Sequence, residues 1–226
     1  MISLSARRSA ACDAKPDRIC RLTLSSPRIV AILLAAGESR RMGYPKPLLR
    51  IDTETFISRT TMLALSVASR LVIVLGAHAV RVRPAIGLNP QITIVENPNY
   101  ERGQLSSLKV GLAEAIRADA DAVIVHLADH PLVLPATFRA LVDEYCKTVR
   151  PIVVARYNGR RGHPVLFDRT VFAELMAAPE DQGARVVVNA DAARVLYVDV
   201  ADPGIVLDLD TPADLESAGL SAPPAI

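Results

Sequence analysis

The sequence predicts an α/β fold, in which helices cover both faces of a mostly parallel sheet. Short apolar runs rich in Val, Ile and Leu alternate along the chain with longer stretches whose apolar residues recur at helical spacing. Strands that alternate with helices are joined by right-handed crossovers, which leave neighbouring strands parallel. With 226 residues, 50% of them hydrophobic, the chain can bury the core of one such domain.

The first part of the chain alternates regularly between these two patterns. A buried strand is expected at 29–35, followed by a helix at 55–69 in which apolar residues recur from Phe56 to Val67. Pro135 is expected to open a later helix, since proline is tolerated at the first helical position. The elements expected between these two helices are strands at 71–76, 92–95 and 122–127 and a helix at 105–117.

The pattern changes after Pro151. Two β-like stretches, 152–157 and 165–167, flank a polar turn at 158–162. Two short helical stretches and a strand at 194–200 follow. The sequence therefore predicts a Rossmann-like three-layer sandwich with a mostly parallel sheet and a β excursion in its C-terminal third.

We expect a single domain at 29–220, between a basic extension and a short tail. Residues 1–28 hold six basic and two acidic side chains, a net charge of +4, and lack the apolar core of a signal peptide. We expect them to form a flexible extension without a function of its own, or to result from an upstream start codon wrongly chosen. Residues 221–226 are expected to fray.

The composition argues against nucleic-acid and membrane partners. The whole chain has a formal charge of +2, so the part that follows the basic extension carries −2. Tryptophan is absent and aromatic residues make up 4% of the chain, so neither a basic surface nor a base-stacking platform is expected. No uninterrupted apolar run approaches the ~20 residues of a membrane span.

The three cysteines, Cys12, Cys20 and Cys146, match neither a disulfide framework nor a zinc-binding pattern. We therefore expect a reducing, cytoplasmic location. Cys146 is expected to be a packing residue at the end of a helix.

The segment from Leu33 to Leu49 carries the strongest functional signal. The first strand ends in Ala35-Ala36-Gly37, which has so little side-chain bulk that a base or a polyphosphate could approach the backbone closely. Arg41 and Lys46 follow, and cations in a glycine-bounded loop suit a triphosphate. The glycine spacing excludes a Walker loop and a dinucleotide fingerprint. The alternative is a basic turn after a core strand.

Asp129 lies just beyond the strand expected at 122–127. Ligands of open α/β sheets bind beyond the carboxyl ends of the strands. A carboxylate delivered there, in the turn Asp129-His130-Pro131, suits Mg²⁺, which takes one or two carboxylates plus substrate phosphates. The alternative is a turn residue or a helix cap.

A second group of carboxylates occurs at 208–214. Thr211 and Asp214 form a capping box and Pro212 suits the first helical position, which explains these three residues without any function. Asp208 and Asp210 alternate in a strand-like stretch and should face the same side. We expect Asp210 to be a metal ligand, with Asp208 beside it or bound through water.

Together these segments resemble the nucleotidyltransferases of the molybdenum cofactor type. The shared motifs are Leu-Ala-Ala-Gly-x-Ser-x-Arg-Met-Gly-x-Pro-Lys-x-Leu-Leu from Leu34, Asp-x-Pro at Asp129 and Asp-x-Asp-Thr-Pro-x-Asp from Asp208. The resemblance implies a fold of the nucleotide-diphospho-sugar transferase type. It also implies that Arg41, Lys46 and Asp129 are catalytic, and that Mg²⁺ binds Asp129, Asp210 and Asp208. The nucleotide would be bound by Leu34, Ala35, Ala36, Gly37, Arg41, Lys46, Ser106 and Ser107.

Two further segments extend the resemblance. Gly103, Ser106 and Ser107 match a family segment placed near the nucleobase, although helix capping alone would explain them. The segment Gly-Arg-Arg-Gly-His-Pro from Gly159 and the segment Asp-Gln-Gly-Ala-Arg at 181–185 match family motifs on the acceptor side. The first could also be an ordinary exposed turn, and the second follows Glu180 where the family usually has glycine. The acceptor-binding residues implied are Arg161, Gly162, His163 and Arg185.

The resemblance implies transfer of CMP from CTP to the phosphate of a molybdopterin-type acceptor, with release of pyrophosphate. Ala35-Ala36-Gly37, in place of Ala-Gly-Gly, favours CTP over GTP. A molybdenum hydroxylase that receives the product is the implied protein partner. The alternatives are GTP as donor, another phosphorylated acceptor, a non-catalytic cofactor-binding maturation protein, and an oxidoreductase descended from the same fold.

Overall fold

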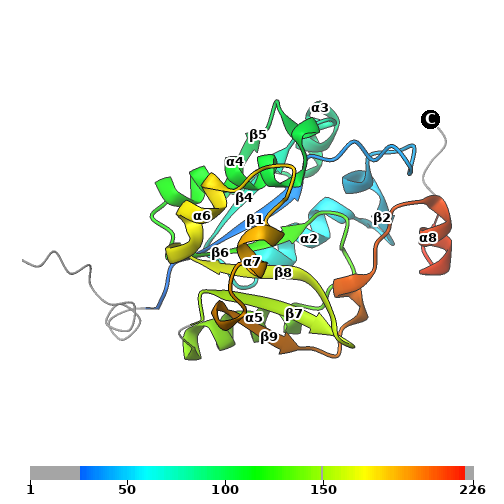
Figure 1. The fold of residues 1–226 in the computed structure, drawn as a ribbon. Coiled ribbons are helices and arrows are strands. Elements are labelled where there is room, and N and C mark those ends of the chain that lie inside the picture. The colour runs from blue at the N-terminus through cyan, green and yellow to red at the C-terminus, as the bar shows by residue number, and fades with distance from the viewer. Residues whose placement is uncertain (1–25, 149, 222–226) are drawn as a thin grey trace, which may run out of the picture.

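A computed structural model describes residues 26–148 and 150–221. Its centre is a seven-stranded sheet with helices on both faces (Figure 1), as the sequence predicts. The strands of this sheet are β1 (Ile29–Ala35), β4 (Arg70–Leu75), β5 (Ile92–Glu96), β6 (Ala122–Leu127), β7 (Ile152–Tyr157), β8 (Arg160–Asp168) and β9 (Val195–Asp199). The α-helices are α2 (Phe56–Leu65), α3 (Ala79–Val82), α4 (Gln104–Arg117), α5 (Pro135–Lys147), α6 (Phe172–Ala177), α7 (Arg185–Asn189) and α8 (Pro212–Ser217).

The strand order is β5-β4-β1-β6-β8-β7-β9, and β8 alone among these strands runs against its neighbours. The reversal follows from a tight β7–β8 hairpin. Its two turn residues, Asn158 and Gly159, both have positive φ, which matches the twist of the strands on either side. The polar turn expected at 158–162 is therefore shorter than predicted, and Arg160, Arg161 and Gly162 already belong to β8.

The two faces of the sheet have separate cores because side chains alternate along each strand. Ile29, Ala31 and Leu33 of β1 face a cluster that includes buried residues of α2, α3 and α5. Val30 and Ile32 face the opposite cluster, with residues of α4, α6 and α7. This arrangement is the three-layer sandwich, and β1 and β6, buried on both faces, form its rigid centre.

A smaller apolar cluster joins two distant parts of the chain. It contains Met42 and Leu49 after β1, Phe56 of α2, and Leu209 and Leu215 near the C-terminus, all buried. Figure 1 accordingly shows α8 beside the short strand β2 (Arg50–Ile51), which pairs with β3 (Glu54–Thr55). The cluster fixes the loop after β1 against the segment that carries Asp210.

Three expectations need correction or fall outside the described residues. The helix expected at 55–69 ends at Leu65, and β4 begins at Arg70. Cys146 is exposed, so it is not a packing residue; the adjacent Tyr145 is the buried one. Residues 1–25, with Cys12 and Cys20, and the tail at 222–226 lie outside the described part. Within that part, no helix is both long and apolar enough to cross a bilayer.

Candidate active site

A cavity of about 440 Å³ opens at the carboxyl ends of β1 and β6. The loop that follows β1 forms much of its wall. Two carboxylates from other segments also line the cavity: Asp129, which follows β6, and Asp210. The predicted nucleotide-binding residues that line it are Leu34, Ala35, Ala36, Gly37, Arg41, Lys46 and Ser107. Gly103, from the segment expected near the nucleobase, also lines the cavity. The other lining residues have no predicted role: Glu38, Ser39, Arg40, Pro47, Tyr100, Glu101, Gln104, Leu127 and Ala128.

The loop after β1 is held in shape by its own polar groups. Ser39 adopts a positive φ of 54°, and its hydroxyl accepts a hydrogen bond from the backbone N–H of Lys46 at 3.0 Å. The backbone carbonyl of Glu38 lies 2.8 Å from Nε2 of His78. A Cβ added at Gly37 would meet nothing within 4 Å, so this residue leaves open space beside the backbone. Arg41 and Lys46 both lie in this loop, and both side chains reach Asp210.

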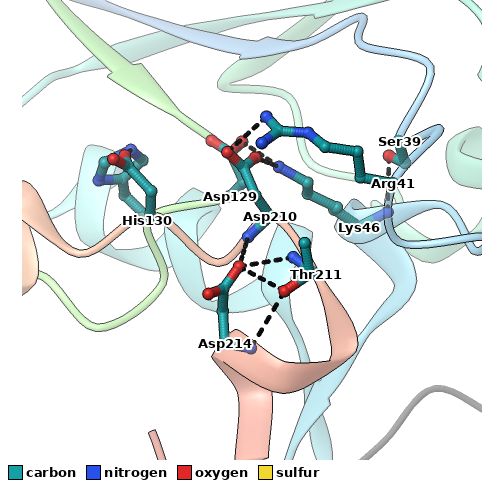
Figure 2. Close-up of polar contacts among 9 residues, drawn as sticks. Ser39, Arg41, Lys46, Asp129, His130, Asp210, Thr211 and Asp214 are labelled. Carbon is teal, nitrogen blue, oxygen red and sulfur yellow. Dashed lines mark hydrogen bonds and ion pairs between the residues drawn. The ribbon is translucent and has the colours of Figure 1, made fainter. Parts of the chain in front are cut away.

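Lys46, Asp129 and Asp210 form the charged centre of the site (Figure 2). The Lys46 ammonium lies 3.0 Å from Oδ2 of Asp129 and also pairs with Oδ1 of Asp210. Arg41 pairs with the other oxygen of Asp210 at 2.6 Å. The Lys46 side chain is 11% exposed, whereas that of Arg41 is 69% exposed and can reach a ligand in the cavity.

These contacts shift the pKa values of Lys46 and Asp210. Burial opposes the charge on Lys46, but the two carboxylates outweigh it and raise the pKa of Lys46 above its ordinary value. The hydrogen bond from Lys46 lowers the pKa of Asp210, against the effect of partial burial. Both groups are therefore fully charged at neutral pH.

Asp210 is positioned by the start of α8. The capping box between Thr211 and Asp214 is present, and Asp214 also accepts a hydrogen bond from the backbone N–H of Asp210 at 3.0 Å (Figure 2). Buried Leu209 anchors the chain just before it. The residues around Asp210 thus act structurally, as capping chemistry indicates, and they hold the Asp210 carboxylate in the site.

Asp208 does not share the environment of Asp210. The stretch 207–210 forms no strand, and the Asp208 side chain is 68% exposed and lies 3.5 Å from Nε2 of His130. Asp210 instead contacts Lys46 and Arg41. The expected strand is therefore not formed, and the two carboxylates contact different partners.

The donor set at the site is compatible with a divalent cation. Among the described residues, no group of three or more His, Cys, Asp or Glu side chains is arranged to hold a metal ion. Asp129 and Asp210 nevertheless converge on one ammonium group, so their oxygens lie close together. Two carboxylates completed by substrate phosphates suffice for Mg²⁺, and the residues present fit that role.

The two serines of α4 have different positions. The hydroxyl of Ser106 donates to the carbonyl of Gly103 at 2.8 Å, so it does not cap the helix, whose N-cap Gly103 has no side chain to do so. Ser107 lines the cavity. The buried amide of Asn97 donates to both hydroxyls, at 2.8 and 3.0 Å. Asn97 had no predicted role, although an asparagine between a strand and a proline indicates a structured turn.

A second cavity of about 570 Å³ adjoins the first and shares Leu34, Gly103 and Gln104 with it. The structure brings all four predicted acceptor-binding residues to its wall: Arg161, Gly162 and His163 of β8 and Arg185 at the start of α7. Its wall also includes the carboxylates of Glu180 and Asp181. The apolar side chains in the wall are Leu105, Leu108, Val125, Val154, Val165, Phe167 and Val188. A planar, partly apolar and anionic ligand suits such a lining.

Polar contacts position the residues of this second cavity. Arg161 donates to the side chain of Asn189 at 2.9 Å, and Arg185 donates to the carbonyl of Gln182 at 3.0 Å. Gly162 packs directly on Ile205, because an added Cβ would lie 2.0 Å from the Ile205 carbonyl oxygen. The two arginines are exposed, so their free N–H groups can bind an anion.

His163 belongs to a group of three neighbouring histidines. Its ring centroid lies 6.0 Å from that of His130, which lies 6.3 Å from that of His126. Burial and the nearby His130 lower the pKa of His163 to about 4, and burial lowers the pKa of His126 well below its ordinary value. Both rings are neutral at pH 7, so His163 can offer a hydrogen bond but no positive charge.

A parallel sheet that directs cations and two carboxylates into one cavity, beside a second cavity lined with arginines, defines a nucleotide-binding α/β protein of the transferase type. Comparison with known families makes this specific. The profile described as the MobA-like NTP transferase domain matches residues 31–195. The chain belongs to this family, and so to the nucleotidyltransferases.

Curated relatives span most of the chain. The molybdenum cofactor cytidylyltransferase of Escherichia coli (strain K12) is 27% identical over 194 residues, which cover 84% of this chain and 95% of that protein. The purine catabolism protein PucB of Bacillus subtilis (strain 168) is 28% identical and covers 85% and 97%. A probable molybdenum cofactor guanylyltransferase of Synechococcus elongatus is 27% identical and covers 84% and 98%.

Solved structures support the same fold. The crystal structure of Rv0371c from Mycobacterium tuberculosis H37Rv has a TM-score of 0.69 and 35% identity, and the match covers 86% of this chain and 98% of that chain. A second crystal structure of Rv0371c, a complex with manganese, has a TM-score of 0.66 and 34% identity, with 84% and 97% covered. The expected fold class is thereby confirmed.

Proposed function

We propose that this protein transfers CMP from CTP to the phosphate of a molybdopterin-type acceptor and releases pyrophosphate. The observation that carries the proposal is the pair of adjoining cavities. One holds Arg41, Lys46, Asp129 and Asp210, and the other holds Arg161, His163 and Arg185. A donor and an acceptor bound in these cavities would meet at their shared wall, next to Gly103 and Gln104.

The reaction is a substitution at the α-phosphorus of CTP. An oxygen of the acceptor phosphate forms the new P–O bond while the bond to the bridging oxygen of pyrophosphate breaks. Arg41 and Lys46 bind the triphosphate and stabilise the charge that develops on the leaving pyrophosphate. The acceptor phosphate is already ionised, so no general base is needed. Positioning and charge neutralisation supply most of the catalysis in such transfers.

Asp129 and Asp210 would hold Mg²⁺, which when bound supplies charge neutralisation for the phosphates. The manganese complex of Rv0371c, at 34% identity, supports a divalent cation in this group of proteins. Asp208 is the less favoured third ligand, because its carboxylate points to His130. We further propose a cytoplasmic protein whose product is received by a molybdenum hydroxylase.

The donor base and the acceptor are the least constrained parts of the proposal. The relatives include both a cytidylyltransferase and a probable guanylyltransferase at the same 27% identity. The preference for CTP rests on Ala36 in place of a glycine. GTP as donor, or another phosphorylated acceptor, would leave the roles of Arg41 and Lys46 unchanged.

The experiment is pyrophosphate release from CTP, GTP, ATP or UTP, each with molybdopterin and with or without Mg²⁺. We expect release with CTP that requires both molybdopterin and Mg²⁺. Mass analysis of the product should give molybdopterin plus one CMP. Absence of release with every nucleotide, from a protein that still binds molybdopterin, would support a cofactor-binding maturation protein instead.

A further inference from the structure

Glu180 stands in the wall of the second cavity, beside Asp181 and Gln182. It belongs to the segment that joins α6 to α7, residues 178–184, which we call the acceptor loop because Arg185 follows it directly. The Glu180 side chain is 19% exposed, unusually enclosed for a carboxylate in a loop. Enclosure of this kind requires charged partners.

Two cations provide these partners, Arg102 just before α4 and Lys109 within it. Nε of Arg102 lies 2.7 Å from Oε2 of Glu180, an ion pair without hydrogen-bond alignment, and the Lys109 ammonium lies 3.7 Å from Oε1. Lys109 is on α4 and is itself only 19% exposed, and it also donates to the carbonyl of Ala178 at 2.8 Å. We call this set of three residues, Arg102, Lys109 and Glu180, the clamp.

The clamp joins the acceptor loop to the wall that the two cavities share. Arg102 immediately precedes Gly103, which lines both cavities. An added Cβ on Gly103 would lie 3.9 Å from the Glu180 carbonyl oxygen, so the two backbones are neighbours. Within the loop, the N–H groups of Gln182 and Gly183 donate to the carbonyls of Pro179 and Glu180. These backbone hydrogen bonds are local, so the contacts between the loop and α4 come from the clamp residues.

We propose that Glu180 is a positioning residue for the acceptor: the clamp fixes the acceptor loop, and with it Arg185, against the shared wall of the two cavities. This inference rests on the proposed function, because it takes the second cavity as the acceptor site. Because Arg102 and Lys109 neutralise the Glu180 carboxylate, Arg161 and Arg185 remain free to attract an anion into the cavity. In-line transfer requires reacting atoms about 3–3.5 Å apart, a distance that a loose loop would not maintain.

The test compares Glu180→Gln with a matched control, Glu174→Gln. Glu174 is on α6 close to the acceptor loop and pairs with Arg194 at 2.7 Å, but it lines neither cavity. Glu180→Gln keeps the side-chain shape and removes the charge. We expect the KM for molybdopterin to rise about two- to fivefold, with the KM for CTP unchanged, and faster hydrogen–deuterium exchange at residues 180–186. Glu174→Gln should leave both KM values and that exchange unchanged.

A double-mutant cycle separates the clamp from the individual side chains. If Arg102 and Glu180 act together, Arg102→Gln/Glu180→Gln should be no worse than Glu180→Gln alone. Additive effects, an equal rise in the KM for CTP, or exchange identical to that of Glu174→Gln would overturn the inference. If the wild-type protein does not use molybdopterin, the proposed function fails, while the exchange measurement still tests whether the clamp holds the loop.

Discussion

Lys46 is the side chain on which the charge balance of the site depends, since it alone contacts both Asp129 and Asp210 among the described residues. We expect Lys46→Met to destabilise the protein at pH 7 by about 1–3 kcal/mol, because two close carboxylates lose their shared hydrogen-bond donor. Thermal unfolding of the variant and the wild type across pH measures this. As a control, Lys147→Met removes a 66%-exposed lysine that pairs with Glu144, and should cost little.

The pKa shifts of Asp210 and Lys46 fix how the stability difference between Lys46→Met and the wild type changes with pH. The pKa of Asp210 is lowered, so its stabilisation is present above its unfolded pKa of about 4 and is lost as the pH falls through the folded value. The pKa of Lys46 is raised, so its stabilisation is present below about 10.4 and is lost as the pH rises through the folded value. The difference between the two proteins should therefore shrink below pH 4; a difference that is constant with pH would refute the ion-pair account.

Asp129 and Asp208 offer a direct comparison of two neighbouring carboxylates. Asp129 lines the nucleotide cavity, whereas Asp208 is mostly exposed beside His130. We expect Asp129→Asn to reduce turnover at least about a hundredfold with a small change in Tm, and Asp208→Asn to stay within a few-fold of wild type. Pyrophosphate release and thermal unfolding are measured on the same samples. Equal losses in both variants would assign Asp208 to the reaction, as a ligand bound through water.

The expected preference for CTP over GTP rests on Ala36. In the structure, the Ala36 methyl group has limited access to a bound base. A Cβ added at Gly76 would lie 2.8 Å from the Ala36 Cβ, so this methyl group packs against Gly76. The likeness to a cytidylyltransferase leads us to expect that CTP is used at least about tenfold better than GTP by kcat/KM, but a methyl group turned toward Gly76 supplies only part of this preference. Ala36→Gly should narrow that preference by no more than a few-fold.

Competition between equal concentrations of the two nucleotides, followed by mass analysis, measures the preference directly. A mainly guanylylated product would overturn the choice of CTP and leave the nucleotidyltransferase family membership standing. If Ala36→Gly instead changed the main product from cytidylylated to guanylylated, the Ala36 methyl group would have to contact the base.

At the scale of elements, two glycines near the carboxyl ends of β1 and β4 have opposite requirements. Gly76 leaves no room for a methyl group, because an added Cβ would lie 2.5 Å from the Ala36 carbonyl oxygen. Gly37 has open space around it and lines the nucleotide cavity. Gly76→Ala should therefore destabilise the fold by about 1–3 kcal/mol, and Gly37→Ala should leave Tm unchanged but raise the KM for the nucleotide.

Thermal unfolding and steady-state kinetics on both variants distinguish these two effects. A large fall in Tm for Gly37→Ala would show that this glycine serves the turn and not the ligand. An unchanged Tm for Gly76→Ala would mean that the turn after β1 can shift without cost.

The sequence predicted the elements that are buried on both sides better than those at the surface. The runs that became β1 and β6 are apolar throughout, and their bounds agree with the structure. The helix expected at 55–69 was predicted too long, because its start has a capping threonine, Thr55, whereas its end has no comparable signal. The pair β2–β3 is only two residues long in each strand, too short for a hydrophobic pattern to reveal.

The site was predictable where it follows from strand ends and not where it depends on packing between distant segments. Loops after β1 and β6 must meet at one edge of a parallel sheet, so the sequence predicts that Lys46 and Asp129 lie at the same edge. The apolar cluster of Met42, Leu209 and Leu215, which brings Asp210 to Lys46 and leaves Asp208 outside, required the folded structure. The same holds for the clamp, whose members are 78 residues apart at Arg102 and Glu180.

At the scale of the whole molecule, the two cavities make one site because they share a wall at Leu34, Gly103 and Gln104. Leu34 belongs to the central strand and Gly103 to the start of α4, so the wall is part of the rigid sheet and of the helix packed on it. Gly111 allows that packing, since an added Cβ would lie 2.6 Å from a methyl group of Ile32. The relative placement of donor and acceptor is therefore built into the core.

The domain itself should begin close to Arg28, which tests the boundary expected from the sequence. The backbone N–H of Arg28 donates to the Asp121 carboxylate at 2.9 Å, its carbonyl accepts from the N–H of Asp121 at 2.9 Å, and its side chain pairs with Asp119.

Removal of residues 1–25 should leave Tm unchanged and activity within a few-fold of the full chain, because the removed segment is basic and lacks apolar periodicity. Removal of residues 1–28 should lower Tm in addition, since it deletes the contacts that join the start of β1 to the start of β6. Thermal unfolding and pyrophosphate release, measured on both truncations, test this boundary. A loss of activity in a folded protein that lacks only residues 1–25 would assign the extension to the site or to an interface.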